Sequence, residues 1–269
     1  MEMREDDNLW QKEQVEALLN SIETGDKEPA SYIDGEKFKQ HNLSAADGIA
    51  GFGAMLESLS DYNEMTKVDI IRMFCDGDYV VAHTDYNLFG EKVGFDIFRY
   101  EDGKIVEHWD NLQEKPENAN PSGRTMTSGR TEIIDFDKSN ENKALIEKFA
   151  NEILVAGKFE NIVDYFEGNT YIQHNPNIGD GLAAFSDAVK TMTENGVVMK
   201  FDKIHKILGE GNFVLLISEG LFGKNGGKPT SFYDLFRIDG GKIAEHWDVV
   251  ETILEQSKRK NSNDKFGFE

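Results

Sequence analysis

One stretch of eight residues occurs twice in this chain, as GKIVEHWD at residues 103–110 and as GKIAEHWD at residues 241–248. From Asp96 to Asp110, 10 of 15 aligned positions are identical in the second copy, at an offset of 138. Upstream, the tripeptide Gln-His-Asn at residues 40–42 reappears at residues 173–175, at an offset of 133. Because the order and spacing hold over the whole repeat, the chain is predicted to contain two copies of one domain.

The repeat divides the 269 residues into two segments of ordinary domain size. We expect the first copy over residues 1–115 and the second over residues 140–256. Residues 116–139 are rich in Pro, Asn, Ser, Gly and Thr, which is typical of a linker. Residues 257–269 form a polar tail that we expect to be frayed.

The chain is strongly acidic, with 50 Asp and Glu against 29 Lys and Arg and a net charge of −21. This charge disfavours nucleic acid and anionic membranes as partners. The N-terminal sequence MEMREDDNLWQKEQ lacks the apolar core of a signal peptide, and no stretch is long and apolar enough for a membrane span. We therefore expect a cytoplasmic protein, unless a signal peptide was removed. The single cysteine, Cys75, lies in an apolar run and is interpreted as a buried structural thiol.

Each half begins with helical patterns and continues with strands. Apolar residues recur at helical spacing over residues 10–22 and 145–154, and a second helix is expected after Asp47-Gly48 and Asp180-Gly181, where the aspartate is a plausible N-cap. Runs rich in β-branched and aromatic residues follow, with hairpin turns at residues 101–103 and 239–241. Helices followed by antiparallel strands indicate an α+β fold.

Strand alternation sorts the repeated residues onto two faces. His108 and Asp110 should share one face of the last strand, whereas Glu107 and Trp109 should point to the other. Asp96 should lie roughly opposite Asp110 on the neighbouring strand. If His41 approaches from the helical layer, these side chains supply the groups for general acid/base chemistry in an apolar cavity. The corresponding residues of the second copy are His246, Asp248, Asp234 and His174.

Other interpretations of these residues remain open. The Glu-His-Trp-Asp stretch could end a strand and bond to a neighbouring helix, with the tryptophans as core residues. Two histidines and a carboxylate could bind a metal, but the spacing matches no recognised ligand signature, so we predict neither a metal nor a cofactor. Four phenylalanines are candidates for lining an apolar pocket: Phe52, Phe98, Phe185 and Phe236.

Together, the Gln-His-Asn, Asp-Gly, Asp-x-Phe-Arg and Gly-Lys-Ile-x-Glu-His-Trp-Asp motifs resemble the SnoaL-like polyketide cyclases of the nuclear-transport-factor-2-like superfamily. The resemblance spans nearly all of each half. It implies two cone-shaped α+β barrels, in each of which a bent antiparallel sheet wraps about three helices around a deep apolar pocket. It also implies that Asp110 and Asp248 act as the acid or base, with Asp96 and Asp234 at a position that holds histidine in some cyclases. A close carboxylate pair favours one protonated and one ionised member.

Two classes of function follow from these observations. The first is a cofactor-independent cyclase, isomerase or dehydratase acting on a small apolar or carbonyl-containing molecule, with His41 and His174 orienting it or donating to its carbonyl. The alternative is a non-catalytic ligand-binding or architectural domain pair; epoxide hydrolysis is disfavoured because no Asp-Arg-Asp arrangement is evident. Domains of this superfamily often pair through their sheets, so we also predict an internal pseudo-dimer that buries Trp109 and Trp247, with a homo-oligomer as a further state.

Overall fold

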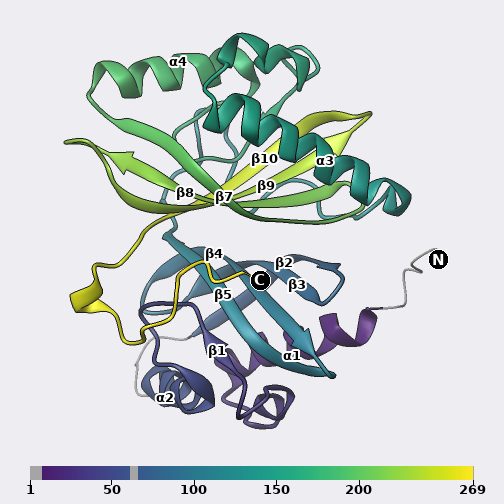
Figure 1. The fold of residues 1–269 in the computed structure, drawn as a ribbon, viewed down its shortest axis with the longest axis vertical. Helices are drawn as coiled ribbons and strands as arrows, with labels where there is room; N and C mark the ends of the chain where they lie inside the picture. Colours follow the sequence, from purple (N-terminus) through teal and green to yellow (C-terminus); the bar gives the residue numbers. More distant parts are fainter. Residues whose placement is uncertain (1–7, 61–65, 269) are drawn as a thin grey trace. The chain divides into compact units, whose positions relative to one another are not determined.

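The computed structural model describes residues 8–60 and 66–268 (Figure 1). Residues 1–7, 61–65 and 269 lie outside this part, and with them half of the N-terminal sequence considered above for a signal peptide. The described chain divides into two compact units. The first comprises the residues up to Glu114 together with those from Leu254 onward, and the second comprises Lys115–Ile253. They are called the first and second domain below.

Both domains have the predicted α+β composition, with the helices preceding the long strands. The first domain contains α1 (Leu9–Thr24), a short β1 (Lys39–Gln40), α2 (Gly48–Ser60), β2 (Lys67–Asp76), β3 (Tyr79–Asn87), β4 (Glu91–Glu101) and β5 (Lys104–Glu114). The second contains α3 (Ser139–Phe149), which continues into a π-helical turn (Ala150–Val155), β6 (Ile172–Gln173), α4 (Gly181–Glu194), β7 (Val198–Glu210), β8 (Phe213–Gly223), β9 (Lys228–Asp239) and β10 (Lys242–Thr252). Short 3-10 turns lie at Glu28–Tyr32, Phe136–Lys138, Phe159–Asp164 and Gln256–Lys258.

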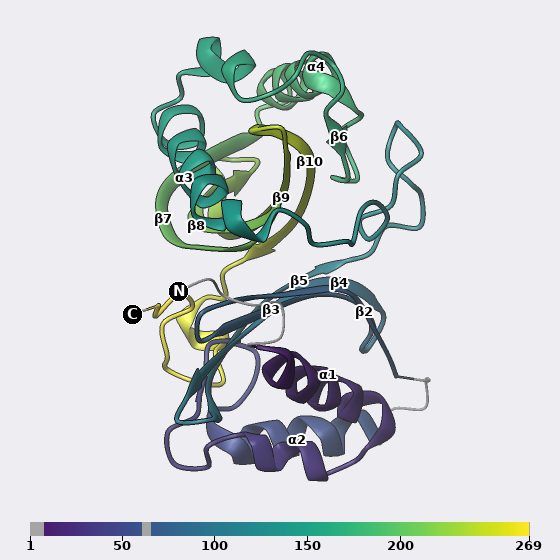
Figure 2. The ribbon, with the colours of Figure 1, turned by 90° about the vertical axis from the view of Figure 1, so that its right-hand side faces the viewer.

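Each domain contains one bent five-stranded sheet, and the strand orders β1-β5-β4-β3-β2 and β6-β10-β9-β8-β7 are equivalent. Figure 2 shows α1 and α2 together on one face of the first sheet. The four long strands are antiparallel, as predicted, whereas β1 and β6 pair parallel with β5 and β10. The sheets are therefore mixed. Two residues are too few to show a strand period, which explains why these edge strands were not predicted.

The strand register confirms the predicted cross-strand pairs. Asp96 pairs with Asp110, and Asp234 pairs with Asp248. Side chains that pair across neighbouring strands lie on the same face, so each aspartate pair lies on the concave, helix-covered face of its own sheet. Glu107 and Trp109 lie on the opposite face, as predicted from parity.

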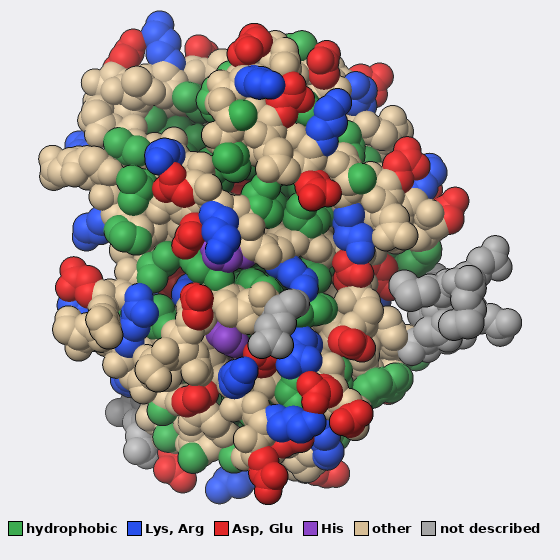
Figure 3. Space-filling model, viewed as in Figure 1, with side chains coloured by type: hydrophobic (Ala, Val, Ile, Leu, Met, Phe, Trp, Pro, Cys, Tyr) green, Lys and Arg blue, Asp and Glu red, His purple; other side chains and the backbone are tan. Residues whose placement is uncertain are grey.

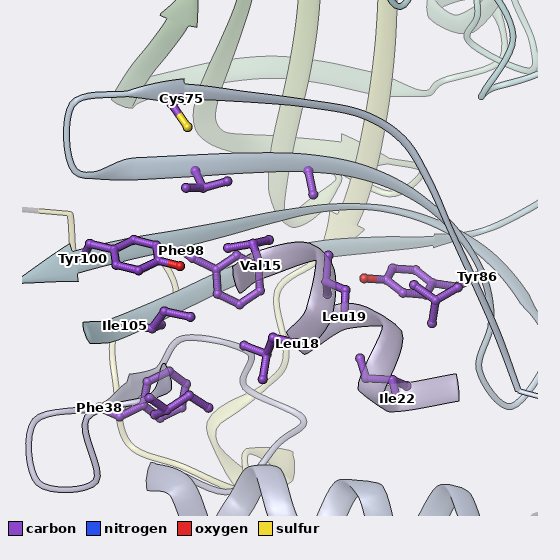
Figure 4. Packing of buried hydrophobic residues seen from close by; sticks show 14 residues of the cluster. Val15, Leu18, Leu19, Ile22, Phe38, Cys75, Tyr86, Phe98, Tyr100 and Ile105 are labelled. Carbon is purple, nitrogen blue, oxygen red and sulfur yellow. The ribbon is translucent and has the colours of Figure 1, made fainter. Parts of the chain in front are cut away.

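The apolar faces of helices and sheet enclose one core in each domain. In the first domain the α1 residues Val15, Leu18 and Leu19 pack against strand residues such as Phe98 and Ile105 (Figure 4). Cys75 is buried in this cluster as a free thiol, which confirms the structural interpretation. In the second domain the equivalent cluster is built around Ile146, Phe149 and Phe236. The two folds are thus stabilised by separate cores.

The aspartates that precede α2 and α4 bond to the neighbouring edge strands, and Asp180 is also the N-cap residue of α4, as predicted. The Asp180 side chain makes no capping hydrogen bond. Its Oδ1 accepts the backbone N–H of Gln173 at 3.0 Å, and the Asp47 carboxylate accepts that of Gln40 at 2.8 Å. Each aspartate therefore fixes the short edge strand that carries the Gln-His-Asn motif.

The linker and the tail both pack closely against a domain, so the predicted fraying of the tail is wrong for residues 257–268. In the first domain the Trp109 indole donates to the Phe266 carbonyl at 2.9 Å, and Phe268 stacks on the same ring. In the second domain the Trp247 indole donates to the Ser128 carbonyl at 2.8 Å. Ser128 and Phe266 are themselves 138 positions apart, so the covering segment belongs to the repeat.

Glycine is required where these segments approach the sheet. A Cβ at Gly129, where φ is +101°, would lie 2.2 Å from Glu245 Oε1, and one at Gly267 would lie 2.6 Å from His41 Cε1. The tryptophans are thus covered by segments of their own compact unit. The pseudo-dimer of two sheets stays a prediction.

The surface shown in Figure 3 carries interspersed acidic and basic side chains. Among the described residues, no helix has the length and apolar character needed to cross a membrane.

Candidate functional site

Each domain holds a cavity between its helices and the concave face of its sheet, but the two differ in size. The second-domain cavity has a volume of about 550 Å³ and is lined mainly by apolar and aromatic side chains, including Phe185 and Phe236. The first-domain cavity is only about 80 Å³, and Phe52 and Phe98 line it. Small-molecule sites typically measure roughly 300–1,000 Å³. Only the second cavity falls within that range.

Polar groups of the second cavity are concentrated where β9 and β10 carry Asp234, His246 and Asp248. The Nε2 atom of His246 lies 3.0 Å from Asp234 Oδ1, and its Nδ1 atom lies 3.0 Å from Gln173 Oε1. Asn175 donates to Asp248 Oδ2 at 2.6 Å. The other carboxylate oxygens, Asp234 Oδ2 and Asp248 Oδ1, are buried and accept no hydrogen bond in the described structure. Two buried carboxylate oxygens of the second domain therefore lack a hydrogen-bond donor among the described residues.

His246 carries a proton on both ring nitrogens. Gln173 Oε1 also accepts the backbone N–H groups of His174 and Asn175, each at 2.9 Å, so this atom is an acceptor and His246 Nδ1 must donate to it. The Nε2 atom faces a carboxylate and donates as well. Burial alone would lower the pKa of His246, but the hydrogen bond and charge of Asp234, with the charge of Asp248, outweigh it and raise the pKa. His246 and Asp234 thus form a buried ion pair.

The carboxyl group of Asp248 is shifted toward its protonated form. Burial raises its pKa, and the nearby charge of Asp234 acts in the same direction, against the lowering effects of His246 and of the Asn175 hydrogen bond. The two carboxyl groups therefore differ, because Asp234 pairs with His246 whereas burial shifts Asp248 toward its protonated form. A carboxylic acid and a carboxylate on one apolar cavity are the groups needed for general acid/base chemistry.

The first domain repeats the same bonds around Asp96 and Asp110. His108 contacts Asp96 Oδ1 at 3.2 Å and Gln40 Oε1 at 3.0 Å, and Asn42 donates to Asp110 at 2.6 Å. Asp110 Oδ1, like Asp248 Oδ1, accepts no hydrogen bond from any residue that the structure describes, so the two domains differ at one carboxylate oxygen. Asp96 Oδ2 is the counterpart of the unbonded Asp234 Oδ2, and it accepts a hydrogen bond from the Tyr86 hydroxyl at 2.7 Å. Both oxygens of the Asp96 carboxylate are therefore hydrogen-bonded to side chains of the same domain.

At two positions on the cavities the first domain carries the larger side chain. Val80 pairs with Phe98, and Val214 pairs with Phe236 in the second copy. The strands β3 and β8 are therefore equivalent at an offset of 134, and the residue of the second copy that corresponds to Tyr86 is Gly220. Figure 4 shows Tyr86 within the apolar cluster of the first domain. On the helix, the offset of 133 matches Met55 with Ala188, and both line their cavity. Larger side chains fill the first cavity at both positions.

Three ligand-type atoms of the first domain, from Asp96, His108 and Asp110, lie within 4.8 Å of one another. A cation is already present beside them, because the buried Lys265 Nζ lies 3.9 Å from Asp110 Oδ1 and donates to the Asp110 carbonyl at 2.8 Å. Burial raises the pKa of Asp110, and the charge of Lys265 opposes that rise. This arrangement favours internal charge compensation over a metal ion.

The structure does not bring His41 and His174 to the cavities, so their predicted approach from the helical layer is wrong. Gln40 pairs with His108 in register, and alternation then turns His41 to the outer face, where it stacks on Trp109 at 4.5 Å. His174 stacks on Trp247 in the same way and lies 2.8 Å from Glu245. Burial would raise the pKa of Glu245, but hydrogen bonds from His174 and Arg237 lower it. Both histidines belong to the contact with the covering segment.

The other ten candidate residues do line the cavities. Sequence reasoning missed Gln173 and Asn175, which flank His174, and their counterparts Gln40 and Asn42. Strand alternation within the tripeptide Gln-His-Asn was the available signal, because the first and third residues must share a face when the second points away.

The raised pKa of Asp248 predicts a pH-dependent effect on stability. A carboxyl whose pKa is higher in the folded state stabilises the fold below the unfolded pKa, and this contribution is lost as the pH rises through the folded pKa. Asp248→Asn should therefore raise the Tm of the second domain at pH 8 and have little effect near pH 4, as measured by calorimetry. The exposed variant Asp187→Asn is the control and should show no such dependence. An Asp248→Asn effect that is equal at both pH values would contradict the raised pKa.

A bent sheet, a helical cover and an interior cavity define a class of α+β cone domains. A family model described as the SnoaL-like domain matches residues 15–108 and 146–246. The two matches cover more than half of the chain and coincide with the two domains. The chain therefore belongs to the SnoaL-like domain family and contains two copies of that domain. A comparison with curated proteins finds no match.

Solved structures resemble single copies of the domain. TsrD from Streptomyces laurentii is 21% identical, with a TM-score of 0.36, over 40% of this chain and 92% of its own. IdmH from Streptomyces antibioticus, provisionally described as a polyketide cyclase, is 16% identical, with a TM-score of 0.34, over 38% of this chain and 91% of its own. An LEH-like epoxide hydrolase from M. tuberculosis is 20% identical, with a TM-score of 0.35, over 42% of this chain and 85% of its own.

Proposed function

We propose that the second domain binds a small apolar molecule with a carbonyl or similar polar group and moves protons within it without a cofactor, as a cyclase, isomerase or dehydratase does. The observation that carries this proposal is the pair of unbonded oxygens, Asp234 Oδ2 and Asp248 Oδ1, on an apolar cavity of about 550 Å³. Buried carboxylate oxygens are normally hydrogen-bonded, so atoms left open in this way are candidates for ligand contact.

The two carboxyl groups have complementary roles in this proposal. Asp234 is the base, because its Oδ1 atom pairs with His246 and its Oδ2 atom accepts no hydrogen bond within the described part of the chain. Asp248 is the acid, because burial favours its protonated form. A proton leaves a ligand carbon for Asp234, and Asp248 gives its proton to a ligand oxygen. The net change is a tautomerisation, or loss of water when the oxygen is a hydroxyl group.

For the first domain we propose the alternative, architectural function. Its cavity of about 80 Å³ is too small for a ligand of this class, and Tyr86 occupies the oxygen that is open in the second domain. The same site residues there stabilise the fold through internal hydrogen bonds. We expect one ligand per chain.

Binding of N-phenyl-naphthylamine, a neutral apolar fluorophore, tests the ligand site. The native chain should bind one equivalent with increased emission. Ala188→Trp should abolish binding, because this side chain of α4 lines the cavity and a large ring would fill it. Ser186→Trp places the same ring on the exposed side of the same helix and should leave binding unchanged. Equal binding by both variants would mean that the fluorophore binds elsewhere and would contradict the proposal.

A further inference from the structure

Tyr171 contributes a phenol to the second cavity at a position where the first domain has none. It lies just before β6, is only 4% exposed and lines the cavity. The offset of 133 matches it with Phe38, whose side chain has no polar atom. The proton-transfer scheme above does not use Tyr171.

Hydrogen bonds around Gln173 determine what the Tyr171 hydroxyl can do. Because Gln173 Oε1 accepts the N–H groups of His174 and Asn175, the other amide atom must be the nitrogen. That Nε2 atom donates to Tyr171 Oη at 2.8 Å. The hydroxyl oxygen is thus already an acceptor, and its own proton has no acceptor among the residues that the structure describes. A buried donor in this state is costly unless a ligand accepts its proton.

We propose that Tyr171 is a ligand-binding residue that donates its hydroxyl proton to a carbonyl oxygen, so that the second domain selects ketones, aldehydes or esters with an apolar body. This inference rests on the proposed function of the same cavity. Burial, with the charges of Asp248 and Asp234, raises the pKa of Tyr171, which keeps the phenol protonated. The donor therefore persists throughout the neutral pH range.

This donor and the carboxyl pair line the same cavity. When Asp234 Oδ2 takes a proton from the carbon beside the carbonyl, the C–H electron pair forms a carbon–carbon double bond and the carbonyl π pair moves onto oxygen. The Tyr171 hydroxyl stabilises the resulting oxyanion, and Asp248 supplies a proton to complete the enol. The phenol that lines the first cavity, that of Tyr86, comes from a different position and is already bonded to Asp96. The free phenol thus distinguishes the second cavity chemically as well as by size.

Prodan, a neutral naphthyl ketone whose emission moves to longer wavelength when its carbonyl accepts a hydrogen bond, tests this assignment. Tyr171→Phe removes only the oxygen and installs the residue type of the first copy. It should shift the emission of bound prodan to shorter wavelength and raise the Kd about tenfold, the order of one net hydrogen bond. Binding of N-phenyl-naphthylamine, which has no carbonyl, should be unchanged. Tyr165→Phe, whose side chain does not line the cavity, is the control and should leave both probes unaffected.

The outcomes separate this inference from the proposed function. Prodan that binds native and Tyr171→Phe chains with the same Kd and emission would overturn the role of Tyr171 and leave the ligand site intact. A native chain that binds neither probe would overturn the ligand site and the inference with it. Equal weakening of both probes by Tyr171→Phe would show a loss of cavity shape and would also overturn the donor role.

Discussion

Asp234→Asn is expected to lower the rate of proton abstraction by about 10²–10⁴-fold, the usual contribution of a positioned general base. A suitable substrate is nitrobenzisoxazole, an apolar heterocycle that opens to a coloured phenolate when a base removes its carbon-bound proton. The amide of asparagine keeps the size of the side chain and can still accept from His246, but it cannot take a proton. Initial rates of phenolate release measure the effect.

Asp96→Asn is the matched control, because Asp96 occupies the same register position in the first domain. We expect it to leave the rate unchanged, since Tyr86 occupies the open side of that carboxylate and the cavity there is too small. Equal losses in both variants would mean that the two domains share the activity. An unaltered rate in Asp234→Asn would contradict the assignment of the base.

Phe266→Ala is expected to destabilise the first domain by about 3–5 kcal/mol, the usual cost of deleting a buried aromatic side chain. Phe266 is 3% exposed, and its backbone carbonyl accepts the indole N–H of Trp109. A second residue of the tail, Asp264, also contacts the outer face of the sheet, because its backbone carbonyl lies 2.5 Å from His41 Nδ1. Loss of the Phe266 ring removes the packing that holds these contacts together. Urea unfolding, followed by tryptophan fluorescence, measures the change.

Ser262→Ala is the control for this measurement, because Ser262 is an exposed residue of the same segment. Its effect should stay within about 0.5 kcal/mol, as is usual for surface positions. A Phe266→Ala variant as stable as Ser262→Ala would show that the tail contributes no stability to the first domain.

The fold could be predicted largely from the repeat and from strand alternation. The doubled Gly-Lys-Ile-x-Glu-His-Trp-Asp stretch gave both the domain number and the faces of Asp110 and Trp109, because the period of a strand is a local property of the backbone. The same rule, applied to the tripeptide before the second helix, places His41 on the face opposite to Gln40 and Asn42, and pairing with β5 decides which face meets the cavity. The short parallel strand that sets this alternation is only two residues long and has no pattern of its own.

Cavity size and the cover of the outer face could not be predicted in the same way. The first cavity is small because Tyr86 and Met55 reach it from elements distant in sequence, and nothing local in β3 or α2 shows where their side chains end. The contact of Phe266 with Trp109 joins residues 157 positions apart. Such contacts depend on tertiary packing. The polar composition of residues 257–268 correctly indicates a surface segment, but composition alone does not distinguish a frayed segment from one held by backbone hydrogen bonds.

The central claim is that Asp248, on the same cavity as Asp234, has a raised pKa that suits it to act as the acid. A pH titration of carbon-13-labelled aspartate carboxyl groups by NMR, comparing the native chain with Asp248→Asn, tests it most directly. We predict that the resonance that the variant lacks titrates above the ordinary aspartate range. If the resonance assigned to Asp248 in the native chain titrates in the ordinary aspartate range, the proposed acid/base pair is contradicted.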